Sequence, residues 1–265
     1  MSIPIKSYDT LTDLEKLSLV DLSYSRMDTY TQCPAKYFYS YIQKEPRQFA
    51  PAATLGNIVH AVLENCLSND SELSLDHMRD EYDKNISIYD PDSLIPKELI
   101  NAGVQIIDEF YDENSDKTFN IYDKEMPFTL IIGSYKVIGF IDRVDVKDDM
   151  VHIVDYKTGK WEVSAKEVPN NLQLGIYALA VSQMFPEKQV YAELHYLRSG
   201  RKKGHLFTHE DIDGVKSKII DIAYKMISDI NYSPTSNIRL CTYCDHAKSG
   251  ACGTGSFRMR NNKYG

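Results

Sequence analysis

The sequence predicts an α/β fold in which helices flank a mixed central sheet. Between Phe128 and Leu197, short apolar runs with strand-like alternation are interleaved with segments of helical spacing. Residues 23–67 have helical spacing, and residues 68–125 are polar and Asp-rich with expected helical insertions. Hydrophobic residues make up 43% of the 265 residues, which is enough for a substantial core. This order of elements is typical of a sheet covered by helices rather than of a helical bundle.

The first part of the chain is predicted to be a lead-in followed by helices. Residues 1–21 read as a loose lead-in. A helix begins after Ser23, whose hydroxyl can cap it, and ends at Cys33-Pro34. The aromatic stretch after that turn resumes helical spacing, and Gly56–Leu67 forms a second helix with one apolar stripe. Further helical insertions are expected around Leu94–Tyr111.

The second part carries the predicted sheet. Gly133-Ser134 is a turn between two strands, and a third strand ends at Lys157. The expected elements are strands at 128–132, 135–146, 151–157 and 190–197, and helices at 168–185 and 211–230. We therefore divide the chain into a lead-in (1–21), a helical part (22–125), a core (126–232) and a cysteine-rich segment with a basic tail (233–265).

Charge and hydropathy exclude some classes of protein. The net charge of −8 argues against a general nucleic-acid coat protein, but it is compatible with an enzyme whose carboxylates hold cations. No apolar run approaches the ~20 residues that span a bilayer, so we expect a cytoplasmic protein with no membrane partner. There the five cysteines are expected to be metal ligands or free thiols rather than disulfides. The sequence has no G-x-x-x-x-G-K-[ST] phosphate loop, so it does not predict a helicase fused to the chain.

Two acidic residues and a lysine are the strongest candidates for chemistry. Side chains alternate along a strand, so Asp155 and Lys157 share one face while their neighbours take the other. Asp142 follows a neighbouring strand and can supply a second carboxylate. A hard divalent cation would explain why charged groups converge beside a core. The same spacing also fits a surface ion pair after a hairpin.

Two helices contribute further candidates. His60 and Glu64 lie on one helical face, and His60 could bind a metal through a neutral ring nitrogen. Gln173 and Tyr177 are four residues apart and also share a face. A structural histidine and an ordinary polar helix face are the alternatives.

The cysteines indicate a second metal site. Cys241 and Cys244 have chelating spacing, and Cys252 adds a third soft ligand suited to zinc or to an iron–sulfur cluster. Cys33 is the candidate fourth ligand, which would close a loop of about 200 residues. Cys66 lies on an apolar stripe and is expected to be buried. His246 could substitute as a ligand if the metal is zinc.

Basic residues gather at two places. They could follow a phosphate backbone, or they could be a solvated turn and the end of the chain. The predicted DNA-binding group, in a loop after the 190–197 strand, is Arg198, Arg201, Lys202 and Lys203, and the tail contains Arg258, Arg260 and Lys263.

As a set, these motifs resemble the RecB-like PD-(D/E)XK nucleases. They are most similar to the iron–sulfur branch, with AddB-type nuclease domains and CRISPR-associated RecB-like exonucleases. The match spans about residues 22–253. In the family's order, the matching residues are Ser23-Tyr24-Ser25, Tyr30, Cys33-Pro34, Tyr37, Gly56, His60, Glu64, Gly139, Asp142-Arg143-Val144-Asp145, Asp155-Tyr156-Lys157-Thr158-Gly159, Gln173, Tyr177 and the three late cysteines.

The resemblance implies a restriction-endonuclease-like core and a role for each matching residue. Lys157 would be the catalytic lysine, with Gln173 and Tyr177 as the helix motif. Mg²⁺ or Mn²⁺ would be bound by His60, Asp142, Asp155 and the Tyr156 carbonyl. A [4Fe–4S] cluster, with zinc as the alternative, would be bound by Cys33, Cys241, Cys244 and Cys252.

The function implied is that of a metal-dependent DNA exonuclease acting on single-stranded ends. The partners implied are DNA and a helicase, recombination or CRISPR adaptation protein. The alternatives are a catalytically inactive, cluster- or zinc-stapled DNA-binding subunit, and a hydrolase of another phosphoester such as RNA. The chain departs from the family pattern at three points: seven residues separate Cys244 from Cys252, Ile141 stands where the family name has proline, and Asp155 replaces the more frequent glutamate.

Overall fold

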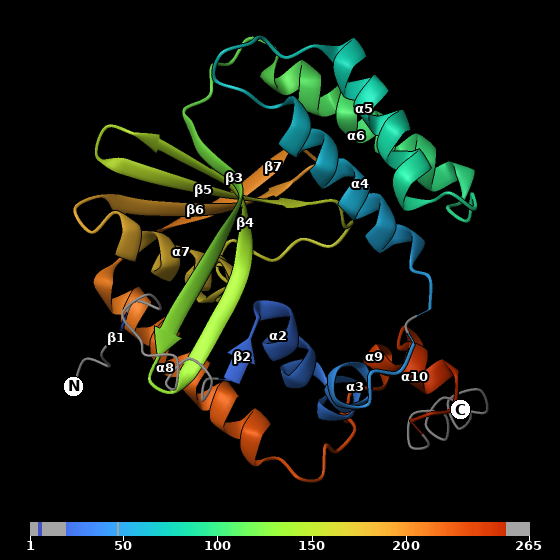
Figure 1. Ribbon diagram of the computed structural model, residues 1–265, viewed down its shortest axis with the longest axis vertical. Coiled ribbons are helices and arrows are strands. Elements are labelled where there is room, and N and C mark those ends of the chain that lie inside the picture. Colours follow the sequence, from blue (N-terminus) through green and yellow to red (C-terminus); the bar gives the residue numbers. More distant parts are fainter. Residues whose placement is uncertain (1–4, 7–19, 47, 253–265) are drawn as a thin grey trace. The chain divides into compact units, whose positions relative to one another are not determined.

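The computed structural model describes residues 5–6, 20–46 and 48–252 and divides the chain into two compact units (Figure 1). Unit 1 comprises residues 1–49, 129–138 and 216–265. Unit 2 comprises residues 50–128 and 139–215. Strands β3 (Ile121–Ile132) and β4 (Tyr135–Lys147) contribute to both units, as does helix α8 (His209–Ser228).

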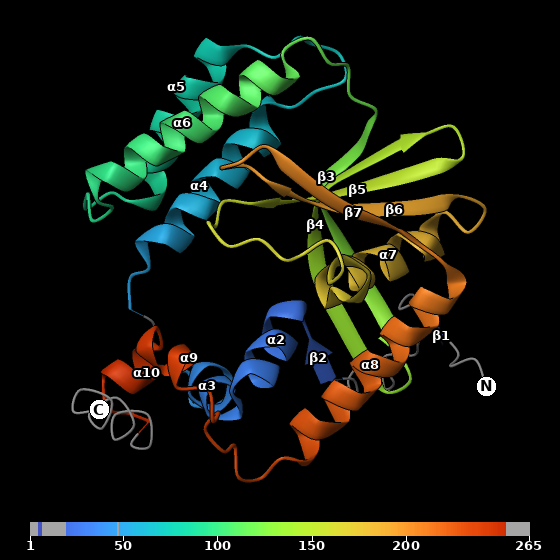
Figure 2. The same cartoon turned by 180° about the vertical axis from the view of Figure 1, so that it is seen from behind.

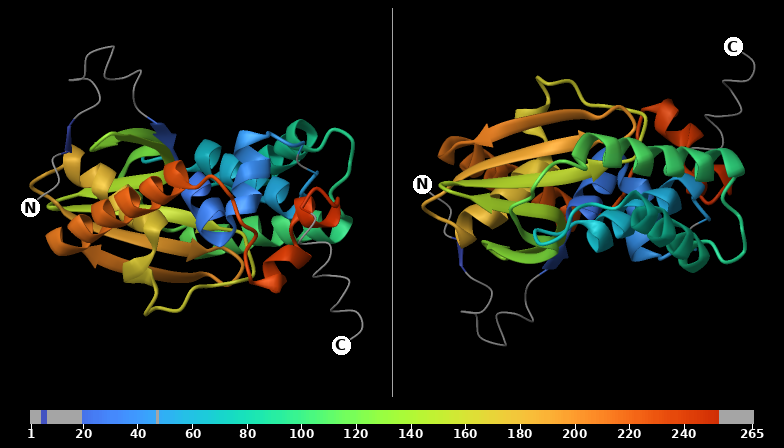
Figure 3. Two further views of the ribbon diagram at one scale, coloured as in Figure 1. Left: turned by 90° about the horizontal axis from the view of Figure 1, so that it is seen from below. Right: turned by 90° about the horizontal axis from the view of Figure 1, so that it is seen from above.

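Three helices form one layer of unit 2. They are α4 (Pro51–Cys66), α5 (Leu75–Tyr89) and α6 (Lys97–Asn114), and α5 and α6 run side by side (Figure 3). Helix α4 begins at Pro51 rather than at the predicted Gly56, because the fixed φ of proline suits a first helical turn. Helix α6 covers most of the region around Leu94–Tyr111 where helical insertions were expected, and α5 precedes it.

The sheet is mixed, as predicted. Strand β5 (Met150–Lys157) pairs antiparallel with β4 and parallel with β6 (Gln189–Tyr196), and β6 pairs antiparallel with β7 (Arg201–Phe207). The strand order is β1-β3-β4-β5-β6-β7, with β2 paired to β4. The predicted loop around Arg201 is wrong, because these basic residues begin β7.

Helix α7 (Leu172–Met184) packs against β5 and β6 (Figures 1 and 2). The helix predicted from residue 168 starts later. A 3-10 turn, η3 (Val168–Asn170), precedes it, and the Asn171 side chain caps α7 by accepting a 3.0 Å hydrogen bond from Leu174 N. Residues 174–181, about two turns of the helix, are all buried, so every face of α7 is packed against other residues there.

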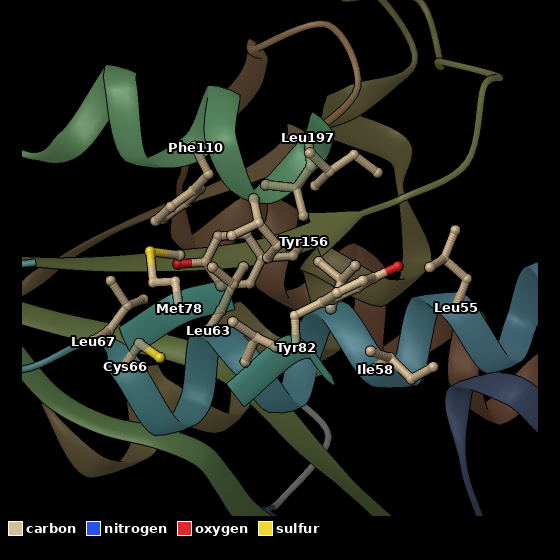
Figure 4. Close-up of a cluster of buried hydrophobic side chains, with 14 of the residues drawn as sticks. Leu55, Ile58, Leu63, Cys66, Leu67, Met78, Tyr82, Phe110, Tyr156 and Leu197 are labelled. Atoms are coloured by element: carbon tan, nitrogen blue, oxygen red, sulfur yellow. The ribbon is translucent and has the colours of Figure 1, made fainter. Parts of the chain in front are cut away.

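The hydrophobic core of unit 2 lies between the three-helix layer and β5. Val154 and Tyr156 of β5 join Leu63, Met78 and Phe110 in one buried cluster (Figure 4). Because strand side chains alternate, Asp155 and Lys157 point to the opposite face, toward α7. The alternation predicted for this strand is therefore present, and the core holds its backbone in place.

Unit 1 contains short elements from distant parts of the sequence. Strand β1 (Ile5–Lys6) pairs with the end of β3, and β2 (Val20–Leu22) pairs parallel with the start of β4, so the predicted lead-in contains two strands. Ser23 caps α2 (Tyr24–Gln32), as predicted. The unit also contains α3 (Pro34–Tyr37), the π-helix η2 (Phe38–Ile42), α9 (Ile238–Thr242) and α10 (Asp245–Lys248).

Among the described residues, none of the helices combines the length and the apolar character that crossing a bilayer requires.

Candidate metal-dependent active site

Two neighbouring strands bring the predicted carboxylates together in unit 2. Arg143 of β4 pairs with Val154 of β5, so the next residues along the two strands are Asp142 and Asp155. The Asp142 carboxylate accepts a 2.7 Å hydrogen bond from the backbone N–H of Tyr156. This bond fixes the carboxylate against the end of β5.

A chain of polar contacts runs from β5 to α7. The Lys157 Nζ lies 2.6 Å from Asp155 Oδ2 and donates a 2.9 Å hydrogen bond to Gln173 Oε1. The amide of Gln173 then donates to the Tyr177 hydroxyl at 2.9 Å. Four of the predicted site residues, Asp155, Lys157, Gln173 and Tyr177, are thus linked by contacts, and the lysine has an acceptor on each of the two elements.

Helix α4 brings His60 to the same place. Its Nε2 lies 3.0 Å from the carbonyl oxygen of Tyr156, and its Nδ1 lies 3.6 Å from Asp142 Oδ2. Lys124 anchors the C-terminal end of this helix, since its ammonium donates to the carbonyls of Glu64 and Leu67. Three of the four predicted cation ligands, His60, Asp142 and the Tyr156 carbonyl, are therefore linked by these contacts, and Asp155 precedes Tyr156 on β5.

Sequence reasoning missed Glu125 of β3. His60, Glu125 and Asp142 each offer one ligand atom, and these atoms lie within 4.8 Å of one another. Glu125 has a φ of +45°, which is unusual for a residue other than glycine and costs on the order of 1–3 kcal/mol. Proline inside an apolar run argues against a strand, so the predicted strand began at residue 128, after Pro127, and left Glu125 out. The strand in fact extends back to Ile121.

The electrostatics of the site favour a bound cation. Burial raises the pKa of Asp155, which is 1% exposed, and the Asp142 charge raises it further, against the effect of Lys157. Burial and Asp142 likewise raise the pKa of Glu125. Burial lowers the pKa of His60, but hydrogen bonding to Asp142 and the nearby carboxylates outweigh it and raise it overall. Three carboxylates repel one another here, and a divalent cation would relieve that repulsion.

The site is open to solvent. An open cavity of about 450 Å³ reaches the site and is lined by His60, Glu125 and Asp142, with Glu64 on the face of α4 that was predicted.

The cysteines form a separate group in unit 1. A cavity of about 170 Å³ is lined by Cys33, Cys241, Cys244 and Cys252, together with His246. His246 is 2.9 Å from the Ser40 hydroxyl through its Nε2. Cys66 is instead buried in α4, where burial raises the pKa of its thiol to about 11. None of the five cysteines, all of which are described, forms a disulfide.

Three of the four predicted DNA-binding cations have partners within unit 2. Arg198 donates a 2.7 Å hydrogen bond to the Thr158 carbonyl. Lys203 donates to the Val163 carbonyl at 2.7 Å and pairs with Glu162 at 2.8 Å, and Arg201 lies 3.6 Å from the same carboxylate. Lys202 is exposed. The predicted basic tail, Arg258, Arg260 and Lys263, lies outside the described residues.

Comparisons with known proteins show what the chain is similar to. Residues 21–249 match the family model of the PD-(D/E)XK nuclease superfamily. The Gene 69 protein of Mycobacterium phage L5 is 23% identical, over 84% of this chain and 93% of that protein. One of the subunits of the ATP-dependent helicase/deoxyribonuclease of Carboxydothermus hydrogenoformans is 27% identical over 92% of this chain, but the chain spans only 25% of that relative. A solved structure described as a "putative exonuclease" from Eubacterium rectale has a TM-score of 0.51 and 12% identity, and covers 88% of this chain and 93% of its own.

Proposed function

The chain belongs to the PD-(D/E)XK nuclease superfamily, and from this we propose that unit 2 hydrolyses DNA phosphodiester bonds with Mg²⁺ or Mn²⁺, acting on single-stranded ends. The observation that carries the proposal is the contact of Lys157 with Asp155 at 2.6 Å and with Gln173 at 2.9 Å, beside Asp142 and His60. A surface ion pair would not explain this arrangement, since Asp155 is 1% exposed.

The ligands for the cation would be His60, Asp142, Asp155 and the Tyr156 carbonyl, to which we add Glu125. Carboxylate and carbonyl oxygens are the donors that hard divalent cations prefer. A bound Mg²⁺ or Mn²⁺ would supply Lewis acidity toward the phosphate and lower the pKa of an attacking water.

The lysine would act on the attacking water or on the charge that develops at phosphorus. Its ammonium is restrained by Asp155 on one side and by Gln173 on the other. Gln173 is in turn restrained by Tyr177, whose pKa burial raises, so the phenol stays neutral. Gln173 and Tyr177 are thus positioning residues, and Lys157 is the group that would reach the substrate.

A digestion panel tests the proposal. We expect cleavage of single-stranded DNA with Mg²⁺ or Mn²⁺ and none with a chelator, because the chelator removes the cation that the three converging carboxylates would bind. The measurement follows end-labelled single-stranded DNA, the matching duplex and RNA of the same sequence. An undiminished rate in chelator would contradict the metal site, and preferential cleavage of RNA would favour the other phosphoester activity.

For unit 1 we propose a structural [4Fe–4S] cluster held by Cys33, Cys241, Cys244 and Cys252. Its support is that these four cysteines, far apart in the sequence, line one cavity of about 170 Å³. The carboxylates and Lys157 already account for the chemistry, so the cluster would stabilise the fold. The helicase/deoxyribonuclease relative supports the further proposal that the chain acts beside a helicase partner.

Purification without oxygen tests the cluster. We expect brown protein containing iron, and we expect Cys252→Ser to lose that iron and to melt at a lower temperature. Cys66→Ser is the matched control, since Cys66 lies in unit 2 and should leave the iron in place. Colourless protein with stoichiometric zinc would show that the cysteines bind zinc rather than a cluster. Full iron occupancy in Cys33→Ser would show that Cys33 is not a ligand.

A further inference from the structure

The single tryptophan of the chain is almost fully exposed. Trp161 has 95% of its surface accessible, in the loop at 158–167 that directly follows Lys157. Tryptophan is usually well buried, because its large apolar surface is unfavourable in water. The indole, four positions from the proposed catalytic lysine, therefore leaves a large apolar surface available to a ligand.

The loop is pinned on both sides of this residue. Before Trp161, the Thr158 carbonyl accepts a 2.7 Å hydrogen bond from Arg198. After it, Val163 donates to the Tyr196 hydroxyl at 3.0 Å and accepts from Lys203 at 2.7 Å. The three anchoring residues, Arg198, Tyr196 and Lys203, are on the β6–β7 hairpin or its turn. The backbone on either side of the indole is therefore restrained, although the ring itself is in solvent.

The residue next to the indole is restrained in the same way. The Glu162 carboxylate accepts a 2.7 Å hydrogen bond from Ser199 and pairs with Lys203 at 2.8 Å. Arg198 and Lys203, predicted from the sequence as DNA contacts, thus fix the loop that displays Trp161. A rigid display lowers the entropy lost when a ligand binds to the ring.

We propose that Trp161 stacks on an unpaired base of the single-stranded DNA whose phosphate reaches Lys157. This inference rests on the proposed nuclease function and names how the substrate is recognised. Every base offers an aromatic face, so stacking tolerates any sequence, and the exposed Lys160 beside the indole can pair with the backbone phosphate. In a duplex the bases already stack on each other, so the indole selects unpaired strands.

The lone tryptophan makes the contact directly measurable. We expect a single-stranded oligonucleotide to quench the emission of Trp161, excited where tyrosine does not absorb, with Ca²⁺ in place of Mg²⁺ and the oligonucleotide verified intact. The blunt duplex of the same sequence should quench much less. An oligonucleotide with abasic sites, which keeps the phosphates, should also quench less. Binding is followed in parallel by the anisotropy of a labelled oligonucleotide.

Variants separate stacking from folding. Trp161→Ala should weaken binding of the single strand by roughly 5- to 100-fold, while Trp161→Phe keeps an aromatic face and should lose less. Because the side chain is exposed, both should melt like the parent protein. Tyr224→Ala is the matched control, since that aromatic is 65% exposed on α8 and should leave binding unchanged.

The outcomes distinguish the two proposals. Binding by anisotropy without quenching, or equal affinity in Trp161→Ala, would overturn the stacking contact and leave the nuclease standing. Equal quenching by duplex and single strand would also overturn it. So would a Trp161→Ala variant that loses as much affinity for the abasic strand as for the intact single strand. If the protein neither binds nor cuts DNA, the proposed function fails and the stacking contact fails with it.

Discussion

Asp155→Asn is expected to reduce DNA cleavage by at least about 10²-fold, the order found when one preorganised electrostatic group is removed from an active site. Asparagine keeps the shape of the side chain and removes only its charge. That charge is the one that would bind the cation and hold the Lys157 ammonium, 2.6 Å away. The measurement is the cleavage rate of single-stranded DNA at saturating Mg²⁺.

The same substitution should not destabilise the protein in chelator. Burial raises the pKa of Asp155, so its ionised form costs the folded state free energy once the pH exceeds the unfolded-state pKa. Removing the charge removes that cost, and the melting temperature should stay the same or rise. A variant that is inactive because it unfolds would contradict this assignment, and so would full activity.

Glu193→Gln is the matched control for a buried carboxylate in the same sheet. Burial raises the pKa of Glu193, but the hydrogen bond and charge of His152 outweigh it and lower the pKa overall. The ionised form therefore stabilises the fold above the unfolded-state pKa. We expect this variant to melt at a lower temperature and to keep its cleavage rate, the opposite of what Asp155→Asn should do.

The sequence predicts the parts of the site that follow from strand periodicity. Asp155 and Lys157 share a face because side chains alternate, and Val154 and Tyr156 are buried behind them. The i, i+4 spacing of Gln173 and Tyr177 was sufficient to place both on one side of α7. Such local geometry is fixed by the backbone, whatever the rest of the fold does.

The parts that the sequence could not predict depend on contacts between distant residues. Glu125 reaches the site through an unusual φ in a strand that contains proline, and no local pattern signals this. The basic residues near Arg201 read as a solvent-facing loop because their partners lie about 40 positions away along the chain, at Glu162 and Val163. Burial and pairing of this kind appear only once the chain is folded.

Lys157→Met is expected to lower turnover by about 10²-fold or more while DNA binding stays within a few-fold of the parent. Methionine keeps most of the length of the side chain without its ammonium. The lysine would act only on the water or on the charge developing at phosphorus, so its loss should appear in kcat rather than in KM. Single-turnover cleavage at saturating protein and equilibrium binding of the labelled strand give the two values.

Gln173→Ala tests the same mechanism and is expected to have a smaller effect than Lys157→Met. The amide oxygen of Gln173 accepts from the Lys157 ammonium at 2.9 Å, and Asp155 still restrains that ammonium when the amide is gone. Loss of a positioning contact of this kind typically costs about 10- to 100-fold, so we expect an intermediate turnover with unchanged DNA affinity. If Lys157→Met cuts as fast as the parent, lysine has no part in the chemistry. If Gln173→Ala is more damaging than Lys157→Met, the amide has a role of its own rather than that of positioning the lysine.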